Sequence, residues 1–307
     1  MTLLLVGVDI GGSKIGLRAL DADTGTLLID RVTPTGRWRG ETDEAKARLL
    51  LELLSSQGLD TVAALAVGAH GCDTQQQCRS LEEALQAQVR YPVRVVNDAH
   101  LLCHAAGEPQ GVGIISGTGS IAVGTTATGD MVFAGGWGWL VGDDGGATGL
   151  VREAVRAGLM AADAGNGDPL LEGILAKAAG VFTLAEVSGL MMRQKPEEWA
   201  LLAPALFTAD AAGSHIARTV IRAASASLAA LLESVLAQGA AADAIVLGGS
   251  VITAQPPFAR EVQEALLKVH PGSHIQVLHR PPVEGAITLA RGLLATHARP
   301  QPDTVPS

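Results

Sequence analysis

The residue types best suited to chemistry gather near the start of the chain, where Asp9 precedes a glycine pair, a serine and a lysine at positions 11–14. Glycines allow a turn with positive φ and let backbone N–H groups approach a bound anion closely. The serine hydroxyl and the lysine add a further donor and a positive charge. The segment therefore suits a phosphate and its metal ion, although an ordinary hairpin leading into residues 15–20 is the alternative.

The element that must position Asp9 is a buried strand. Residues 3–8 are leucine, valine and glycine without a polar interruption, which is typical of a strand covered on both faces. Ligands of α/β proteins collect at the carboxyl ends of such strands, where Asp9 stands. No GxxxxGK[ST] pattern occurs and a strand rather than a helix follows, so this is not a Walker loop.

The first third of the chain has the element order β-β-β-α-β-α-β. After the first strand, the pattern predicts strands at 15–20, 26–32, 61–67 and 93–96, helices at 41–57 and 81–89, and a further helix at 99–106. This order is typical of a ribonuclease H-like half.

The same order then begins again. Two strands, 111–115 and 121–125, flank a second glycine-rich turn, and a third is predicted at 131–133. An irregular loop with two tryptophans, 135–149, leads into a helical region at about 147–236. Beyond it we expect a strand at 244–247, a helix at 258–269, a strand at 275–277 and a helix at 286–296. We interpret this as an internal duplication whose second copy carries a helical insertion. The domains are then 1–108 and 109–283, followed by a loose proline-rich tail at 298–307.

Composition narrows the class of partner. The 22 basic and 31 acidic residues of the 307-residue chain give a net charge of −9, which argues against nucleic acid and anionic membranes. The apolar run before Asp9 is too short to span a bilayer and lacks a basic leader. Cys72, Cys78 and Cys103 show no CxxC spacing, so we expect reduced thiols, a cytoplasmic protein and no cysteine-held metal.

Five motifs in order carry a family resemblance: GVDIGGSK (7–14), VVNDAH (95–100), GIISGTGSIAVG (113–124), GGWGWLVGDDGGATG (135–149) and IVLGGSV (245–251). Together they resemble the N-acetylglucosamine kinase and BadF/BadG branch of the actin-like ATPases. The resemblance implies an α/β fold of two ribonuclease H-like domains with an active-site cleft between them. It also implies a C-terminal helix at about 284–297 that returns to the first domain, and a homodimer formed through the second.

The resemblance also implies roles for particular residues. Asp98 would accept the proton of a sugar hydroxyl as that oxygen attacks the γ-phosphorus of ATP, and Asp9 would hold Mg²⁺ through water. The ATP-binding residues would be Gly11, Gly12, Ser13, Lys14, Gly117, Thr118, Gly119, Gly248, Gly249 and Ser250. The sugar-binding residues would be Asp98, Thr118, Ser120, Gly136, Trp137 and Asp143.

Simpler roles remain open for these residues. Asp9 could cap its strand, Asp98 could cap the helix that follows it, and the glycine motifs could be plain turns. The two tryptophans of the 135–149 loop could pack between domains, which we expect for Trp139 more than for Trp137. His100 and His104 have the i, i+4 spacing of metal ligands but no third ligand in sight, so we expect them in the helix core or surface.

Three positions depart from the family pattern. Ile121 stands where the animal enzymes carry an asparagine that touches the sugar, and Asp144 replaces the usual glutamate. The step Gly145-Gly146-Ala147 replaces a Gly-Ser-type step, so the acetamido end of the pocket differs.

We therefore expect an ATP-dependent kinase that phosphorylates the 6-hydroxyl of N-acetylglucosamine, with glucosamine or glucose as alternative substrates. A BadF-type ATPase activator is the alternative from another class, but it would hold an iron–sulfur cluster through cysteines whose spacing is not found here. A sugar-responsive repressor would need a helix-turn-helix before the first strand, which the sequence does not contain.

Overall fold

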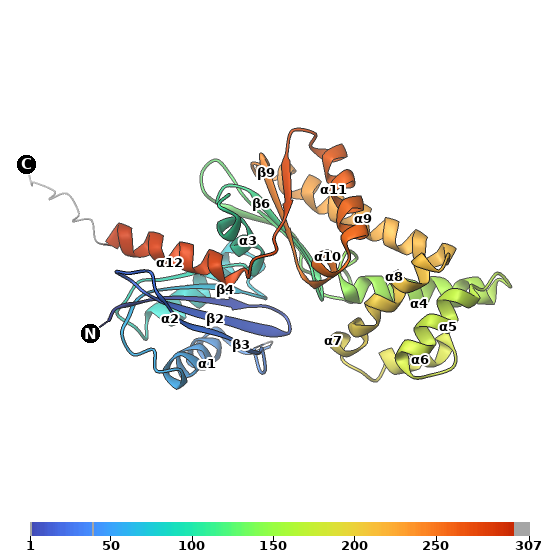
Figure 1. Ribbon diagram of the computed structural model, residues 1–307, viewed down its shortest axis with the longest axis horizontal. Helices are drawn as coiled ribbons and strands as arrows, with labels where there is room; N and C mark the ends of the chain where they lie inside the picture. The colour runs from blue at the N-terminus through green and yellow to red at the C-terminus, as the bar shows by residue number, and fades with distance from the viewer. Residues whose placement is uncertain (1, 39, 298–307) are drawn as a thin grey trace, which may run out of the picture. The chain divides into compact units, whose positions relative to one another are not determined.

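The computed structural model describes residues 2–38 and 40–297, so the predicted tail at 298–307 lies outside the described residues. The described chain divides into two units (Figure 1). The first contains residues up to Pro109 and the segment from Arg280 onward, and the second runs from Gln110 to His279. Each unit is built on one five-stranded sheet.

The sheet of the first unit has the order β3-β2-β1-β4-β5. Its strands are β1 (Leu4–Ile10), β2 (Lys14–Asp21), β3 (Leu27–Pro34), β4 (Val62–Ala69) and β5 (Val93–Val96). β1 pairs antiparallel with β2 and parallel with β4, and β4 pairs parallel with β5. Every residue of β4 and all but one of β1 are buried, because both strands lie inside the sheet and are covered on both faces.

The helices of the first unit are α1 (Asp43–Ser56), α2 (Gln75–Gln86), α3 (Asp98–Ala106) and α12 (Val283–His297). α12 packs along β1, β4 and α3, on the sheet face opposite α1 (Figure 1). Glycines allow this close seating: a Cβ on Gly285 would come within 2.2 Å of the Leu101 carbonyl oxygen, and one on Gly7 within 2.9 Å of the Ile287 nitrogen. The C-terminal helix thus forms part of the core of the first unit.

The sheet of the second unit repeats this arrangement with the order β10-β9-β6-β7-β8. Its strands are β6 (Val112–Ser116), β7 (Ser120–Thr125), β8 (Met131–Gly135), β9 (Ala244–Gly248) and β10 (His274–Val277). In both sheets an antiparallel three-stranded meander is extended by two parallel strands. The predicted fold class, a duplicated ribonuclease H-like α/β fold, is confirmed.

The helices of the second unit lie mostly between β8 and β9. They are α4 (Ala147–Asp163), α5 (Pro169–Ala179), α6 (Leu184–Met191), α7 (Pro196–Trp199), η1 (Ala200–Leu202), α8 (Ala203–Ala211) and α9 (His215–Ala237), with α10 (Ser250–Ala254) and α11 (Pro256–Val269) after β9. By length and composition alone α9 could cross a membrane, as could α5 and α6 taken as one bent span. The buried face of α9 packs instead on β7, β8 and α11, as in the core helix of a folded domain.

One predicted helix is displaced. We predicted residues 81–89, but α2 runs from Gln75 to Gln86. Thr74 caps it by accepting a hydrogen bond from the Gln77 backbone N–H, and Gln77 is the glutamine of a capping-box sequence. The polar residues of the first turn have no apolar periodicity, so the pattern places the start of the helix too late.

Candidate active site

The turn between β1 and β2 is a two-residue hairpin loop made of Gly12 and Ser13. The Gly11 N–H donates to the Lys14 carbonyl oxygen at 2.9 Å, and the Thr35 hydroxyl donates to the Gly11 carbonyl oxygen at 2.8 Å. Within the described part of the chain, no protein acceptor faces the N–H groups of Gly12 and Ser13. The tip of the hairpin thus presents two consecutive amide donors, which suits an anion.

The idea that the glycine pair supplies a turn with positive φ is wrong. Neither Gly11 nor Gly12, both of them described, has positive φ, because the hairpin closes without a left-handed residue. A Cβ on Gly11 would lie 3.5 Å from the Lys14 carbonyl oxygen, an ordinary contact. Because glycines have no side chain, they leave the backbone N–H groups at this tip open to a ligand.

Three aspartates lie at or just after the carboxyl ends of three parallel strands of the first unit. Asp9 lies in β1 beside Gly16 and Gly68, Asp73 follows β4, and Asp98 begins α3 directly after β5. Burial, and then the Asp98 charge, raise the pKa of Asp9 to about 7, with Lys14 acting in the opposite direction. Burial, and then the Asp73 charge, raise the pKa of Asp98 to about 7. The Asp98 carboxyl therefore has the proton affinity expected of a general base near neutral pH.

Sequence reasoning missed Asp73. Three residues, His70, Gly71 and Cys72, separate it from the end of β4, and it lies in the loop before α2. A signal was present: like Asp9 and Asp98, Asp73 lies close to the carboxyl end of a strand, and parallel strands end at a common edge of the sheet.

Asp98 does not cap its helix. The cap is Asn97, whose Oδ1 accepts a 2.8 Å hydrogen bond from the Ala99 N–H. Asn97 is fully buried, and its Nδ2 donates to the Cys72 carbonyl oxygen and to Asp73 Oδ1, each at 3.1 Å. Because Asn97 is the N-cap of α3, helix capping does not explain the carboxylate at position 98.

The second glycine-rich hairpin, between β6 and β7, is held by the start of α4. The Ala147 N–H donates to the Gly117 carbonyl oxygen at 2.8 Å, and the Thr148 N–H and hydroxyl donate to the Thr118 carbonyl oxygen at 3.0 and 2.9 Å. The first N–H groups of α4 are therefore used to fix the hairpin. The N–H groups of Thr118 and Gly119 have no protein acceptor among the described residues, so this tip repeats the donor pair of the first.

Asp143 supports the same hairpin. Its Oδ1 accepts a 3.0 Å hydrogen bond from the Ser120 N–H, and a Cβ on Gly119 would come within 2.6 Å of its Oδ2. Asp143 has φ 61°, the only positive φ of a non-glycine residue in the described chain. Ser120 is buried, and its Oγ accepts from the Gly145 N–H at 3.3 Å. Thr118, Ser120 and Asp143, predicted to bind the sugar, are thus brought together beside the hairpin.

The turn after β9 lies against the hairpin too. Gly249 has φ 96°, and a Cβ there would be 2.3 Å from the Ser116 carbonyl oxygen. The predicted ATP-binding residues Gly248 to Ser250 therefore adjoin Gly117, whose own Cβ position lies 3.8 Å from the Gly249 Cα. Only glycine meets both requirements at position 249.

The two tryptophans of the 135–149 loop differ. The Trp137 residue is 74% exposed, whereas Trp139 makes an edge-to-face contact with Trp199 at 5.9 Å between ring centroids. Gly136, next to Trp137, has positive φ and donates its N–H to the Ser120 carbonyl oxygen at 2.9 Å. Packing within the second unit, rather than the expected packing between domains, accounts for this contact of Trp139, and Trp137 remains available to a ligand.

Arg152 of α4 fixes this loop, and the sequence contained no signal for it. Its guanidinium donates to the carbonyl oxygens of Trp139 and Gly142, the second at 2.9 Å, and it pairs with the Asp144 carboxylate. One planar donor group thus holds three points of the loop.

The three cysteines and the pair His100 and His104 lie inside the first unit. Cys72, Cys78 and Cys103 are buried free thiols, and the described residues contain no group of three potential ligands placed for a metal. The His100 and His104 Nε2 atoms are 3.1 Å apart, and burial lowers the pKa values of these residues to about 3 and 4. They are neutral partners of each other in the helix core.

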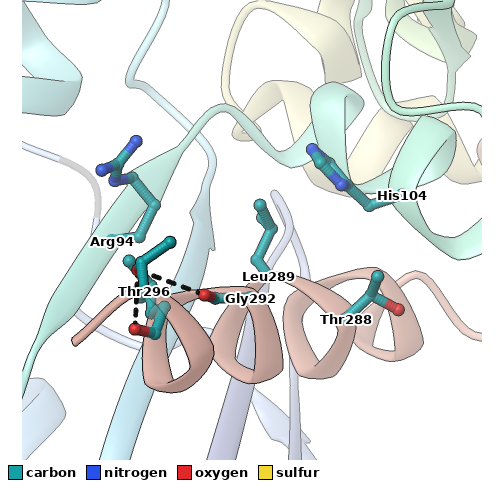
Figure 2. A pocket seen from close by; sticks show the side chains of 7 residues that line it. Arg94, His104, Thr288, Leu289, Gly292 and Thr296 are labelled. Carbon is teal, nitrogen blue, oxygen red and sulfur yellow. Dashed lines mark hydrogen bonds between the residues drawn. The ribbon is translucent and has the colours of Figure 1, made fainter. Parts of the chain in front are cut away.

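A cavity of about 400 Å³ lies in the first unit beside α12 (Figure 2). Its polar groups already have partners: the Thr296 hydroxyl donates to the Gly292 and Leu293 carbonyl oxygens, and Arg94 pairs with Glu82. None of the residues predicted to bind ATP, sugar or metal lines it. The lining is Arg94, His104, Thr288, Leu289, Gly292, Leu293 and Thr296.

Comparison with known proteins defines the class. Residues 6–288 match the BadF/BadG/BcrA/BcrD ATPase family, and the chain belongs to this family. An N-acetylmuramic acid/N-acetylglucosamine kinase of Clostridium acetobutylicum is 30% identical over 178 residues, 55% of this chain and 58% of that protein. An N-acetyl-D-glucosamine kinase of Dictyostelium discoideum is 26% identical over 76% of this chain and 79% of that protein.

Solved structures share the fold. A candidate N-acetylglucosamine kinase from Chromobacterium violaceum superposes with a TM-score of 0.68 at 21% identity, covering 95% of this chain and 98% of that one. A ROK family glucokinase from Streptomyces griseus, in complex with glucose and AMPPNP, gives 0.55 at 17% identity, covering 94% and 98%. The fold is therefore that of sugar kinases.

Proposed function

We propose that the protein is an ATP-dependent amino-sugar kinase that phosphorylates the 6-hydroxyl of N-acetylglucosamine. The observation that carries the proposal is the pair of hairpin tips, each with two consecutive amide donors that have no acceptor among the described residues, together with the partly buried Asp98, whose pKa is raised. Two relatives named as N-acetylglucosamine kinases support the substrate class. Glucosamine and glucose are the alternatives.

In this proposal the two units act as the two domains of the kinase, and both supply phosphate-binding backbone. The amides of Gly12 and Ser13 from one unit, and of Thr118 and Gly119 from the other, bind ATP phosphates. Lys14 adds a positive charge to the first tip. Gly249 and its neighbours support the nucleoside. Phosphoryl transfer asks for positioning and charge neutralisation more than for covalent chemistry, and these groups supply both.

Asp98 is the proposed base. With a pKa of about 7 it is ionised in a large share of molecules at neutral pH and can take the proton of the sugar hydroxyl. Asp9 and Asp98 suit a nearby divalent cation, because burial, and then a neighbouring carboxylate, raise the pKa values of both, and a positive charge would favour their ionised forms. Mg²⁺, held by Asp9 through water, would neutralise charge on the ATP phosphates.

The sugar would lie on the loop that follows β8. Trp137 offers an exposed aromatic face for a pyranose, and Asp143 a carboxylate next to the phosphate hairpin. The sequence departs from the family pattern at Ile121, at Asp144 and at the 145–147 step. Glucosamine and glucose therefore remain alternative substrates, and the experiment below includes both. A cytoplasmic location, with which the buried free thiols agree, and a homodimer, which rests on the resemblance alone, belong to the same proposal.

The family match also keeps an ATPase activator as a second candidate. Such a protein would hydrolyse ATP without a sugar and would act on a protein partner.

One experiment separates these functions. ADP release from Mg-ATP is measured without sugar and with N-acetylglucosamine, glucosamine, glucose or N-acetylmannosamine, using Asp98→Asn as the control. Strong stimulation by N-acetylglucosamine that the variant lacks is the expected result. Equal ATP turnover under all conditions would refute the kinase proposal and favour the activator.

A further inference from the structure

Of the three aspartates near the strand ends of the first unit, Asp9, Asp73 and Asp98, only Asp73 has no role in the proposed reaction. Its Oδ1 accepts a 3.1 Å hydrogen bond from Nδ2 of Asn97, the residue directly before Asp98. Asn97 is fully buried. Loss of the Asp73 acceptor would therefore leave a buried amide donor with one partner fewer, which is costly in a folded protein.

Asn97 joins two segments that meet at the edge of the sheet. Its Nδ2 also donates to the Cys72 carbonyl oxygen at 3.1 Å, and its Oδ1 accepts from the Ala99 N–H at 2.8 Å. The bonds to Asp73 and Cys72 hold the loop that follows β4, and the bond from Ala99 holds the first turn of α3. These bonds therefore hold Asn97 and Ala99, the residues on either side of Asp98.

The loop that carries Asp73 is itself fixed by α2. The Asp73 N–H donates to Gln77 Oε1 at 2.9 Å, and the Cys78 thiol donates to the Cys72 carbonyl oxygen at 3.4 Å. Thr74 caps the helix between them. The carboxylate of Asp73 is therefore presented to Asn97 from a loop that is hydrogen-bonded to α2, which suits a group that positions another.

We propose that Asp73 is a positioning residue for phosphoryl transfer, which through Asn97 fixes the first turn of α3 and the orientation of the Asp98 carboxylate. The inference rests on the proposed kinase function. The raised pKa of Asp98 is due first to burial and then to the charge of Asp73. A misplacement of about 1 Å at a reacting group costs on the order of 10²-fold in rate, so the effect on turnover should be large.

The test compares Asp73→Ala with Asp73→Asn at pH 8.5, where Asp98 is ionised in every variant. We expect kcat to fall between about ten- and a hundred-fold in Asp73→Ala, with KM for ATP changed less than about twofold. Asparagine keeps an oxygen that accepts the bond from Asn97, so Asp73→Asn should regain most of kcat. An unchanged kcat in Asp73→Ala, or an equal loss in both variants, would overturn the proposal.

A second cap in the same unit supplies the matched control. Thr42 caps α1 by accepting a hydrogen bond from the Ala45 N–H at 3.3 Å. Thr42→Ala removes a hydrogen-bond acceptor at the start of a helix away from Asp98, and should lower the melting temperature without the loss of kcat. A similar fall of kcat in Thr42→Ala would show that general destabilisation explains the effect and would overturn the positioning role.

Amide hydrogen exchange gives a readout that needs no sugar. The Ala99 N–H should exchange faster in Asp73→Ala than in the wild type, and at the wild-type rate in Asp73→Asn. If the wild type phosphorylates no sugar, the kinase proposal fails, and the role of Asp73 in phosphoryl transfer fails with it. Hydrogen exchange then reports only whether the Asp73–Asn97 hydrogen bond holds the first turn of α3. If the wild type is a kinase and exchange in Asp73→Ala is unchanged, only the positioning role fails.

Discussion

Replacing the proposed base with asparagine should make the protein more stable while it destroys activity. The Asp98 pKa rises from 3.8 to about 7 on folding, mainly through burial and then through the Asp73 charge. A carboxyl whose pKa is raised in the folded state binds its proton more tightly there, so the wild type loses stability as pH rises from about 4 to about 7. Asp98→Asn removes this loss.

The magnitude follows from the shift. A difference of about 3 pH units at about 1.4 kcal/mol per unit sets a ceiling of about 4 kcal/mol above pH 7. The advantage of the variant should grow by about 2 kcal/mol between pH 5.5 and pH 8.5, because part of the loss is already present at the lower pH. Removing the Asp98 charge also relieves Asp9, which acts in the same direction.

Melting curves without nucleotide and Mg²⁺ at these two pH values test this reasoning. For a domain of this size, about 1 kcal/mol corresponds to roughly 2–4 °C in melting temperature. Asp60→Asn, at an exposed aspartate of the same unit, is the control and should show no such trend. If Asp98→Asn melts no higher than the wild type at pH 8.5, burial does not raise the proton affinity of Asp98 and the argument is refuted.

Three further predictions concern the second unit. Gly249→Ala should weaken ATP binding and should destabilise the protein by more than backbone strain alone, which is about 1–3 kcal/mol, because its Cβ would also clash with the Ser116 carbonyl oxygen. Gly213→Ala is the control, since Gly213 has a similar φ of 99° with open space around it and should show the backbone strain alone. Equal effects of the two substitutions would contradict the clash. Arg152→Ala should raise KM for the sugar with KM for ATP unchanged, because it frees the loop around Trp139; the reverse pattern in steady-state kinetics would count against this. Asp168 is buried and accepts hydrogen bonds from the Ser214 hydroxyl at 2.7 Å and from two backbone N–H groups, which, after the opposing effect of burial, lower its pKa. Asp168→Ala should cost about 2–3 kcal/mol at pH 7 in denaturant unfolding, and less in acid, because a lowered pKa stabilises the fold only while the group is ionised; a loss independent of pH would exclude the charge.

The sequence predicted the parts of the site that follow local pattern. Asp9 lies near the carboxyl end of a buried strand and Asp98 lies two residues after another strand, so their place at the end of the sheet could be inferred from period and residue type. The two-unit α/β fold followed from an element order that occurs twice. Local pattern also located both hairpins, although not the backbone angles of Gly11 and Gly12.

What the sequence could not predict depends on contacts between distant segments. Asn97 bonds to Asp73 across 24 positions, and Asp143 bonds to Ser120 across 23. Arg152 resembles any exposed helical arginine until the loop that it holds is placed beside it. Such partners are fixed by the packing of α2, α3 and α4 on their sheets, which no short-range periodicity encodes.

The most direct test of the central claim is to identify the product. N-acetylglucosamine and Mg-ATP are incubated with the wild type and with Asp98→Asn, and the mixture is analysed by phosphorus NMR and mass spectrometry. We predict equimolar ADP and N-acetylglucosamine 6-phosphate with the wild type, and neither with the variant. Inorganic phosphate without a phosphorylated sugar, or phosphate on a different hydroxyl, would contradict the account.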